Sequence, residues 1–199
     1  MSDEPPLTSE ERQRRAVQLC CTFMSNLGFH RAGMRPEVQG KLFAPTHPQE
    51  AFWREVHINF IDICVLEWCK LFTDRRGKDW GKHHWRRVVA EPARFEAKLY
   101  TTLGVTAAEF DDLIAPVRKY RDKFVAHLDE VRVMDWPSLE QPMKAVEFLF
   151  ERLAREAHSH HENWRRLRLP TTVADLNWIH EQAFQQAHSV YAETLDRCL

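Results

Sequence analysis

Glycines, cysteine pairs and long apolar runs are scarce in this chain of 199 residues. Its 6 glycines leave few places for tight turns, whereas 12 Phe and 7 Trp supply bulky apolar surface, a balance that favours long helices. The longest apolar run, residues 58–69, is interrupted by Asn59, Asp62 and Glu67 and falls short of a bilayer span. Residues 1–15 are polar and lack the apolar core of a signal peptide. We therefore expect a cytoplasmic protein without a membrane segment.

The cysteine and charge contents exclude further classes. The 5 cysteines are odd in number and show no CxxC spacing, so we predict free thiols, with no disulfide, metal site or cofactor. A net charge of −1 gives no general attraction to nucleic acid or membranes. Within residues 70–87, however, seven basic residues outweigh two acidic ones, so any contact with a polyanion should be local.

Apolar residues recur at three- and four-residue spacings along most of the chain, the pattern of amphipathic helices. We predict an all-α fold, a helical bundle of four to five main helices plus short helices, in one domain over residues 1–199. Its core spans about residues 51–150, and residues 29–50, rich in Gly and Pro, form a long loop. Residues 73–84 are a second predicted loop.

Several helix ends are marked in the sequence. Thr8 or Ser9 can cap a first helix that ends near Gly28, and Thr171 or Thr172 can cap the last one. Thr106 and Glu109 form a capping box that begins another helix. Pro116 within that helix lacks an amide, so we expect a kink or a break there, with the regular part from 117 to about 129.

The helix after Pro116 combines an apolar stripe with a dense set of polar side chains. These include Arg118, Arg121, Asp122, Lys123 and His127. A histidine titrates near neutrality and can move a proton, while an arginine offers a permanently charged fork that fits phosphate oxygens. Arg121 and His127 are therefore sufficient for RNA cleavage by the 2′-hydroxyl without a metal. A solvated charged face is the alternative interpretation.

The segment YRDKFVAHLD (120–129), preceded by WCKLF (68–72) and His84-Trp85, resembles the HEPN superfamily of helical ribonucleases. Specifically, it is similar to the abortive-infection branch, and the resemblance covers about residues 51–150. It implies a metal-independent endoribonuclease of host-defence or toxin type. In that interpretation Arg121 holds the scissile phosphate, His127 is the general base or acid, and Asp122 positions these two side chains.

The spacing of Arg121 and His127 limits what one chain can do. Six residues place the two side chains about 120° apart around a helix and about 9 Å apart along it. The resemblance implies a homodimer in which two copies of this helix line one cleft, with RNA as substrate and an antitoxin protein as a possible partner. Leu128 follows His127 where related toxins have a nearby tyrosine, so control by tyrosine modification is not expected.

Further residues are candidates for RNA binding beside Arg118 and Lys123. Trp85, Arg86 and Arg87 could stack on bases and bind phosphates, although Trp85 could equally be a core anchor. The histidines near residue 160 and in the last helix lack the spacing of a metal site. The alternative function, from a different class, is a non-catalytic HEPN-like module that binds a nucleotide or a partner protein.

Overall fold

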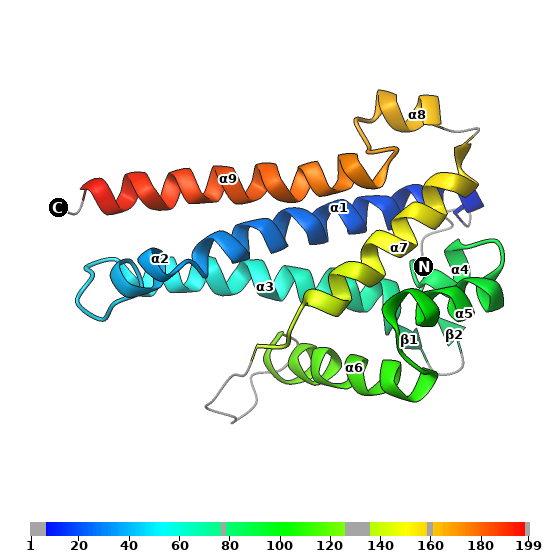
Figure 1. Ribbon diagram of the computed structural model, residues 1–199, viewed down its shortest axis with the longest axis horizontal. Helices are drawn as coiled ribbons and strands as arrows, with labels where there is room; N and C mark the ends of the chain where they lie inside the picture. Colours follow the sequence, from blue (N-terminus) through cyan, green and yellow to red (C-terminus); the bar gives the residue numbers. More distant parts are fainter. Residues whose placement is uncertain (1–6, 77–78, 126–135, 159–160, 198–199) are drawn as a thin grey trace, which may run out of the picture.

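The computed structural model describes residues 7–76, 79–125, 136–158 and 161–197. Within them it contains nine α-helices, one π-helical turn and a single two-stranded hairpin (Figure 1). Of the described residues 78% are helical, so the all-α prediction is confirmed. No helix in the described ranges has the length and apolar content needed to cross a membrane.

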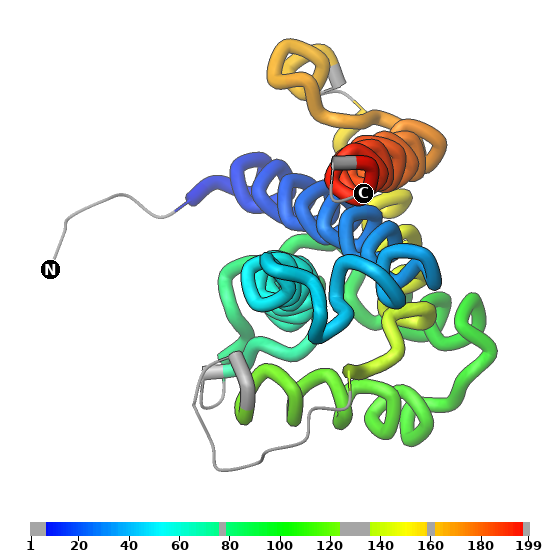
Figure 2. Tube along the Cα trace, turned by 90° about the vertical axis from the view of Figure 1, so that its left-hand side faces the viewer, coloured from blue at the N-terminus to red at the C-terminus, as the bar shows by residue number. Residues whose placement is uncertain are grey.

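Three long helices form the frame of the molecule. They are α1 (Ser9–Gly33), α3 (Glu50–Phe72) and α9 (Val173–Arg197). The helix α1 lies between the other two, parallel to α9 and antiparallel to α3 (Figures 1 and 2). Thr8 begins α1 with the predicted type of cap, completed by Glu11 as a capping box, and Thr172 caps α9.

The first helix does not end near Gly28, and the loop predicted for residues 29–50 is wrong in part. The helix α1 continues to Gly33, and α2 (Pro36–Lys41) follows almost at once. A Cβ on Gly28 would lie 2.4 Å from the backbone oxygen of His180 on α9. Gly28 therefore serves close packing of two helices, a role that its sequence context does not distinguish from helix termination.

Pro116 does not break its helix. The helix α6 (Ala107–Tyr120) begins with the predicted capping box and continues through Pro116. Because Pro116 lies on the exposed face, water can hydrate the carbonyl that loses its amide partner. The irregularity comes later, in the π-helical turn η1 (Arg121–Val125), so the regular helix runs through Pro116 to Tyr120. Residues 126–129 of the predicted regular part lie outside the described residues.

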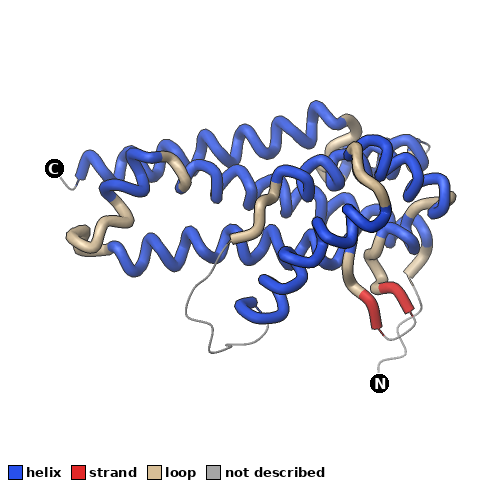
Figure 3. The backbone as a smooth tube through the Cα atoms, turned by 60° about the horizontal axis from the view of Figure 1, so that its bottom comes forward, coloured by secondary structure: helices blue, strands red, loops and turns tan. Residues whose placement is uncertain are grey.

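Short elements connect α3 to α6. The predicted loop 73–84 contains a small antiparallel hairpin, β1 (Arg75–Arg76) and β2 (Asp79–Trp80), with Arg75 opposite Trp80. The predicted short helices follow as α4 (Trp85–Val88) and α5 (Pro92–Leu103), and α5 ends at Gly104 in the left-handed conformation. The hairpin lies beside α6, which is in the foreground of Figure 3.

The helix α7 (Glu140–Glu156) crosses the frame and closes the core, and α8 (His161–Arg166) leads to α9. Trp68 is completely buried, and its indole N–H donates to the Pro142 carbonyl at 3.2 Å, which joins α3 to the start of α7. Cys20, Cys21, Cys64 and Cys69 are free thiols, as predicted, while Cys198 lies outside the described residues.

Candidate functional site

A cleft of about 530 Å³ lies where the end of α3, the hairpin and α6 meet. Most of its lining is polar or charged, and three of the residues are arginines. The lining residues are Thr73, Asp74, Arg75, Trp80, Asp111, Ala115, Arg118 and Arg121. Three arginines line one hollow, so the cleft can offer positive charge to a phosphate group.

Arg121 is held in place by several contacts. Its Nη1 donates to Thr73 Oγ1 at 3.2 Å, and its Nε donates to Asp122 Oδ1 at 2.8 Å. Just before it, the hydroxyl of Tyr120 donates to Asp62 on α3 at 2.7 Å, which fixes the end of α6. Tyr120 therefore ties the end of α6 to α3, and Arg121 is held by one bond to Thr73, the residue after α3, and one to its neighbour Asp122.

The environment of Arg121 keeps it charged. Its side chain is only 24% exposed, and this burial by itself would lower the pKa. The hydrogen bond to Asp122 and the charges nearby outweigh burial and raise the pKa of Arg121 above its usual value. Arg121 is thus a permanent cation that has lost part of its hydration. Such a cation binds a phosphate more strongly than a fully hydrated cation does.

Trp80 is part of a stack of aromatic and cationic groups behind the cleft. Its ring stacks on His84 at 4.2 Å, and the guanidinium groups of Arg75 and Arg86 lie 5.0 and 5.2 Å from its ring centre. The stack holds Arg75 on the cleft side of the hairpin. It therefore gives the cleft one rigid wall.

His84 is the structural centre of this wall. Its Nδ1 accepts from the Arg86 amide at 3.2 Å, so its Nε2 carries the proton and donates to the Phe72 carbonyl at 3.0 Å. Burial lowers the pKa of His84 to about 4, which keeps the ring neutral near pH 7. His84 is therefore a helix cap and a spacer for Trp80, with no proton to exchange with a ligand.

The predicted site residues are partly brought together. Arg118 and Arg121 line the same cleft, and Asp122 accepts a hydrogen bond from Arg121. Lys123 lies in the same turn η1 but not in the lining of the cleft. His127 lies outside the described residues, and no histidine is present among the described residues that line the cleft.

The prediction that Trp85 stacks on RNA bases is wrong. Its side chain is 3% exposed and packs against Phe95 at a ring distance of 5.1 Å, so it is a core anchor. Arg86 lies 4.4 Å over the Trp85 ring and forms an ion pair with Glu96, so its charge is already engaged. Only Arg87 of this group is exposed, although one of its N–H groups donates to the Trp80 carbonyl.

Arg75 and Thr73 are site residues that the sequence did not single out. Arg75 is one of the seven basic residues of the stretch 70–87. The excess of positive charge in that stretch is the only sequence feature that points to a phosphate site there. Nothing in the sequence indicates that this stretch lies against Arg118, more than 40 residues later. That proximity depends on how the hairpin and α6 pack.

No protein-family model, curated protein or solved structure matches this chain. Among the described residues, no three His, Cys, Asp or Glu side chains come together as a possible metal site. The assignment of this site therefore depends on the chemistry of its own residues.

Proposed function

We propose that this chain is a metal-independent endoribonuclease of the HEPN type, acting in host defence or as a toxin, and that the cleft at Arg121 binds the phosphate to be cleaved. The observation that supports this most directly is the convergence of Arg75, Arg118 and Arg121 on one hollow. Arg121 belongs to the segment 120–129 that resembles the family, Arg118 lies just before it on α6, and Arg75 comes from the hairpin.

The chemistry needs a charged cradle and a proton carrier. The ribose 2′-oxygen bonds to phosphorus while the bond to the 5′-oxygen breaks, which leaves a 2′,3′-cyclic phosphate and a 5′-hydroxyl. Arg121, fixed by Asp122 and Thr73, would stabilise the negative charge that gathers on the phosphoryl oxygens. His127 would take the proton of the 2′-hydroxyl or give one to the leaving 5′-oxygen.

The proposal includes a homodimer. The resemblance places two copies of the 121–127 segment around a shared cleft, so that each chain supplies an arginine and a histidine to one site. Such an arrangement avoids the poor alignment of Arg121 and His127 along a single helix. A dimer built around this segment is thus part of the proposed activity.

Cleavage of labelled single-stranded RNA in EDTA tests this function. We expect the purified chain to yield cyclic-phosphate ends, and we expect His127→Ala and Arg121→Ala each to slow cleavage about 100-fold or more. Arg35→Ala is the matched control, because Arg35 is an exposed arginine at the α1–α2 junction, at the opposite end of the molecule from the hairpin (Figure 1). Cleavage that persists in His127→Ala, or that needs added metal, would overturn the proposal.

A second candidate is a non-catalytic module that binds a nucleotide or a partner protein at the same cleft. It is favoured by the internal ion pair of Arg121 with Asp122 and by two carboxylates, Asp74 and Asp111, in the lining, which make the cleft less suited to RNA. In that case RNA is not cut, binding of the nucleotide or partner weakens in Arg121→Ala, and His127→Ala has no effect. The same variants therefore separate the two functions.

A further inference from the structure

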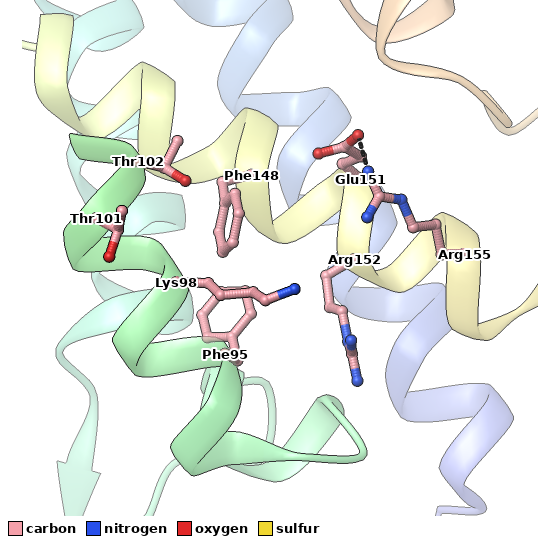
Figure 4. Close-up of a pocket in the computed structure, with 8 residues that line it drawn as sticks. All are labelled: Phe95, Lys98, Thr101, Thr102, Phe148, Glu151, Arg152 and Arg155. Atoms are coloured by element: carbon pink, nitrogen blue, oxygen red, sulfur yellow. Dashed lines mark hydrogen bonds and ion pairs between the residues drawn. The ribbon is translucent and has the colours of Figure 1, made fainter. Parts of the chain in front are cut away.

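A separate cavity of about 220 Å³ lies between α5 and α7 (Figure 4). Its lining shares no residue with the cleft at Arg121. It consists of Phe95, Lys98, Thr101 and Thr102 on α5, and Phe148, Glu151, Arg152 and Arg155 on α7.

The inner surface of this cavity is aromatic. Phe95 is 1% exposed, and its ring centre lies 5.1 Å from that of Phe148, tilted by 39°. Phe148 is only half-buried and points from α7 into the space between the helices (Figure 4). An aromatic ring that remains partly exposed in a hollow is a surface on which a planar ring can stack.

The rim of the cavity is cationic, but its three cations are not equivalent. Arg152 is engaged by Glu91 at 3.0 Å and by Glu156, and Arg155 forms an ion pair with Glu151. Lys98 makes no ion pair in the part of the chain that the structure describes. Its ammonium reaches across the gap toward Arg152 on α7 (Figure 4), so a positive charge without a partner stands at the cavity.

Hydroxyl groups complete the rim. The hydroxyl of Thr101 donates to the Ala97 carbonyl at 2.9 Å, whereas Thr102 is exposed and has no hydrogen bond from its side chain among the described residues. The cavity is smaller than the roughly 300–1,000 Å³ typical of drug-sized ligands. It can enclose one aromatic base, so the ribose and phosphate of a nucleotide would lie outside the hollow, against the cations and hydroxyls of its rim.

We infer that the α5–α7 cavity binds a single nucleotide, with the base on Phe148 and the phosphate on Lys98 and Thr102. Lys98 supplies the charge that a phosphate needs, Phe148 supplies the stacking surface and Thr102 supplies a hydroxyl donor. Arg155 can turn from Glu151 to a second phosphate oxygen, because its side chain is 69% exposed. This inference does not depend on the function proposed for the cleft at Arg121.

Calorimetric titration of the full chain with 5′-AMP tests the site. We expect one nucleotide per chain, with adenosine and inorganic phosphate each binding at least about tenfold more weakly, because each provides only one of the two contacts. Lys98→Ala should weaken 5′-AMP binding about tenfold. Lys144→Ala is the matched control, since Lys144 is an exposed lysine of α7 outside the cavity lining. Arg121→Ala should leave the affinity unchanged, which separates this site from the proposed active site.

Phe148→Leu tests the stacking surface and should also weaken 5′-AMP binding about tenfold. Its thermal unfolding is measured alongside, and Lys98→Ala carries the test if this variant does not fold. A DNA tetranucleotide is titrated as well, because without a 2′-hydroxyl it cannot be cut by the proposed reaction. Comparing it with 5′-AMP shows whether the site takes a free nucleotide or one within a strand. Binding of free 5′-AMP indicates a soluble nucleotide, whereas Lys98-dependent binding of the tetranucleotide alone indicates a nucleotide within a strand. The inference is overturned if neither ligand binds or if binding is the same in Lys98→Ala.

Discussion

Gly28→Ala is expected to destabilise the fold by about 3 kcal/mol, near the upper end of the cost of overpacking a tightly packed core. A Cβ at this position would lie 2.4 Å from the His180 backbone oxygen and 2.9 Å from the Phe184 amide nitrogen, both on α9. Backbone atoms cannot rotate away as the end of a side chain can. The two helices must therefore separate, and α1 has its most extensive contacts with α9.

Thermal unfolding followed by circular dichroism measures this effect. A loss of about 3 kcal/mol corresponds to a fall in Tm of about 6–12 °C for a chain of this size. Gly40→Ala is the matched control, because Gly40 lies in α2 and has no neighbouring atom within 4 Å of an added Cβ. Alanine favours a helix over glycine by about 1 kcal/mol, so the control should be neutral or slightly stabilising. Equal Tm values for the two variants would contradict the close approach of α1 and α9.

Gly28 also illustrates which features of the fold the sequence does not predict. Capping boxes at Thr8 and Thr106 and the apolar spacings of the long helices were predictable, because they depend on residues close in sequence. The role of Gly28 depends on a helix about 150 residues away, and the tolerance of Pro116 depends on which face of α6 meets solvent. Such tertiary contacts leave no local pattern.

The candidate site also contains some residues that the sequence predicts and others that depend on how the chain packs. Arg118, Arg121 and Asp122 were predictable as a group, because they lie on one short segment with an unusual polar content. Arg75 joins them only because the hairpin packs beside α6. Trp85 was misassigned as a base-stacking residue because composition does not distinguish an aromatic ring on the surface from one in the core, and its burial is a property of the packed structure.

We expect the fold to lose stability in acid, because two histidines are buried in its core. His30 on α1 and His57 on α3 are 8% and 1% exposed, and their rings stack at a distance of 4.6 Å. Trp136 lies edge-on to both rings at 5.4 Å. Within the described ranges, Nδ1 of His30 and both ring nitrogens of His57 have no hydrogen-bond partner. A proton on either ring would be a buried charge without compensation.

The direction of the pH effect follows from the pKa values. Burial, with the charge of Arg31, lowers the pKa of His30 to about 4, and burial, with His30 and Arg54, lowers that of His57 to about 3. In the unfolded chain both histidines titrate near 6.5, so below that pH the unfolded state binds more protons. Stability is thus complete above about pH 6.5 and falls as the pH is lowered toward 4. At pH 5 each histidine should lower the free energy of unfolding by about 2 kcal/mol relative to its value above pH 6.5.

Urea unfolding at pH 7.5 and pH 5.0 checks this, with His57→Leu as the diagnostic variant. Because the His57 nitrogens make no hydrogen bonds to the part of the chain that the structure describes, leucine loses none of these, and we expect little change in stability at pH 7.5. At pH 5.0 the variant should retain about 2 kcal/mol that the unmodified chain loses. His188→Gln is the control, because its side chain is 39% exposed and the variant removes a histidine without removing a buried ring. If His57→Leu loses as much stability in acid as the unmodified chain, the buried pair is not the source of the effect, and His84, whose pKa is also lowered by burial, becomes the next residue to replace.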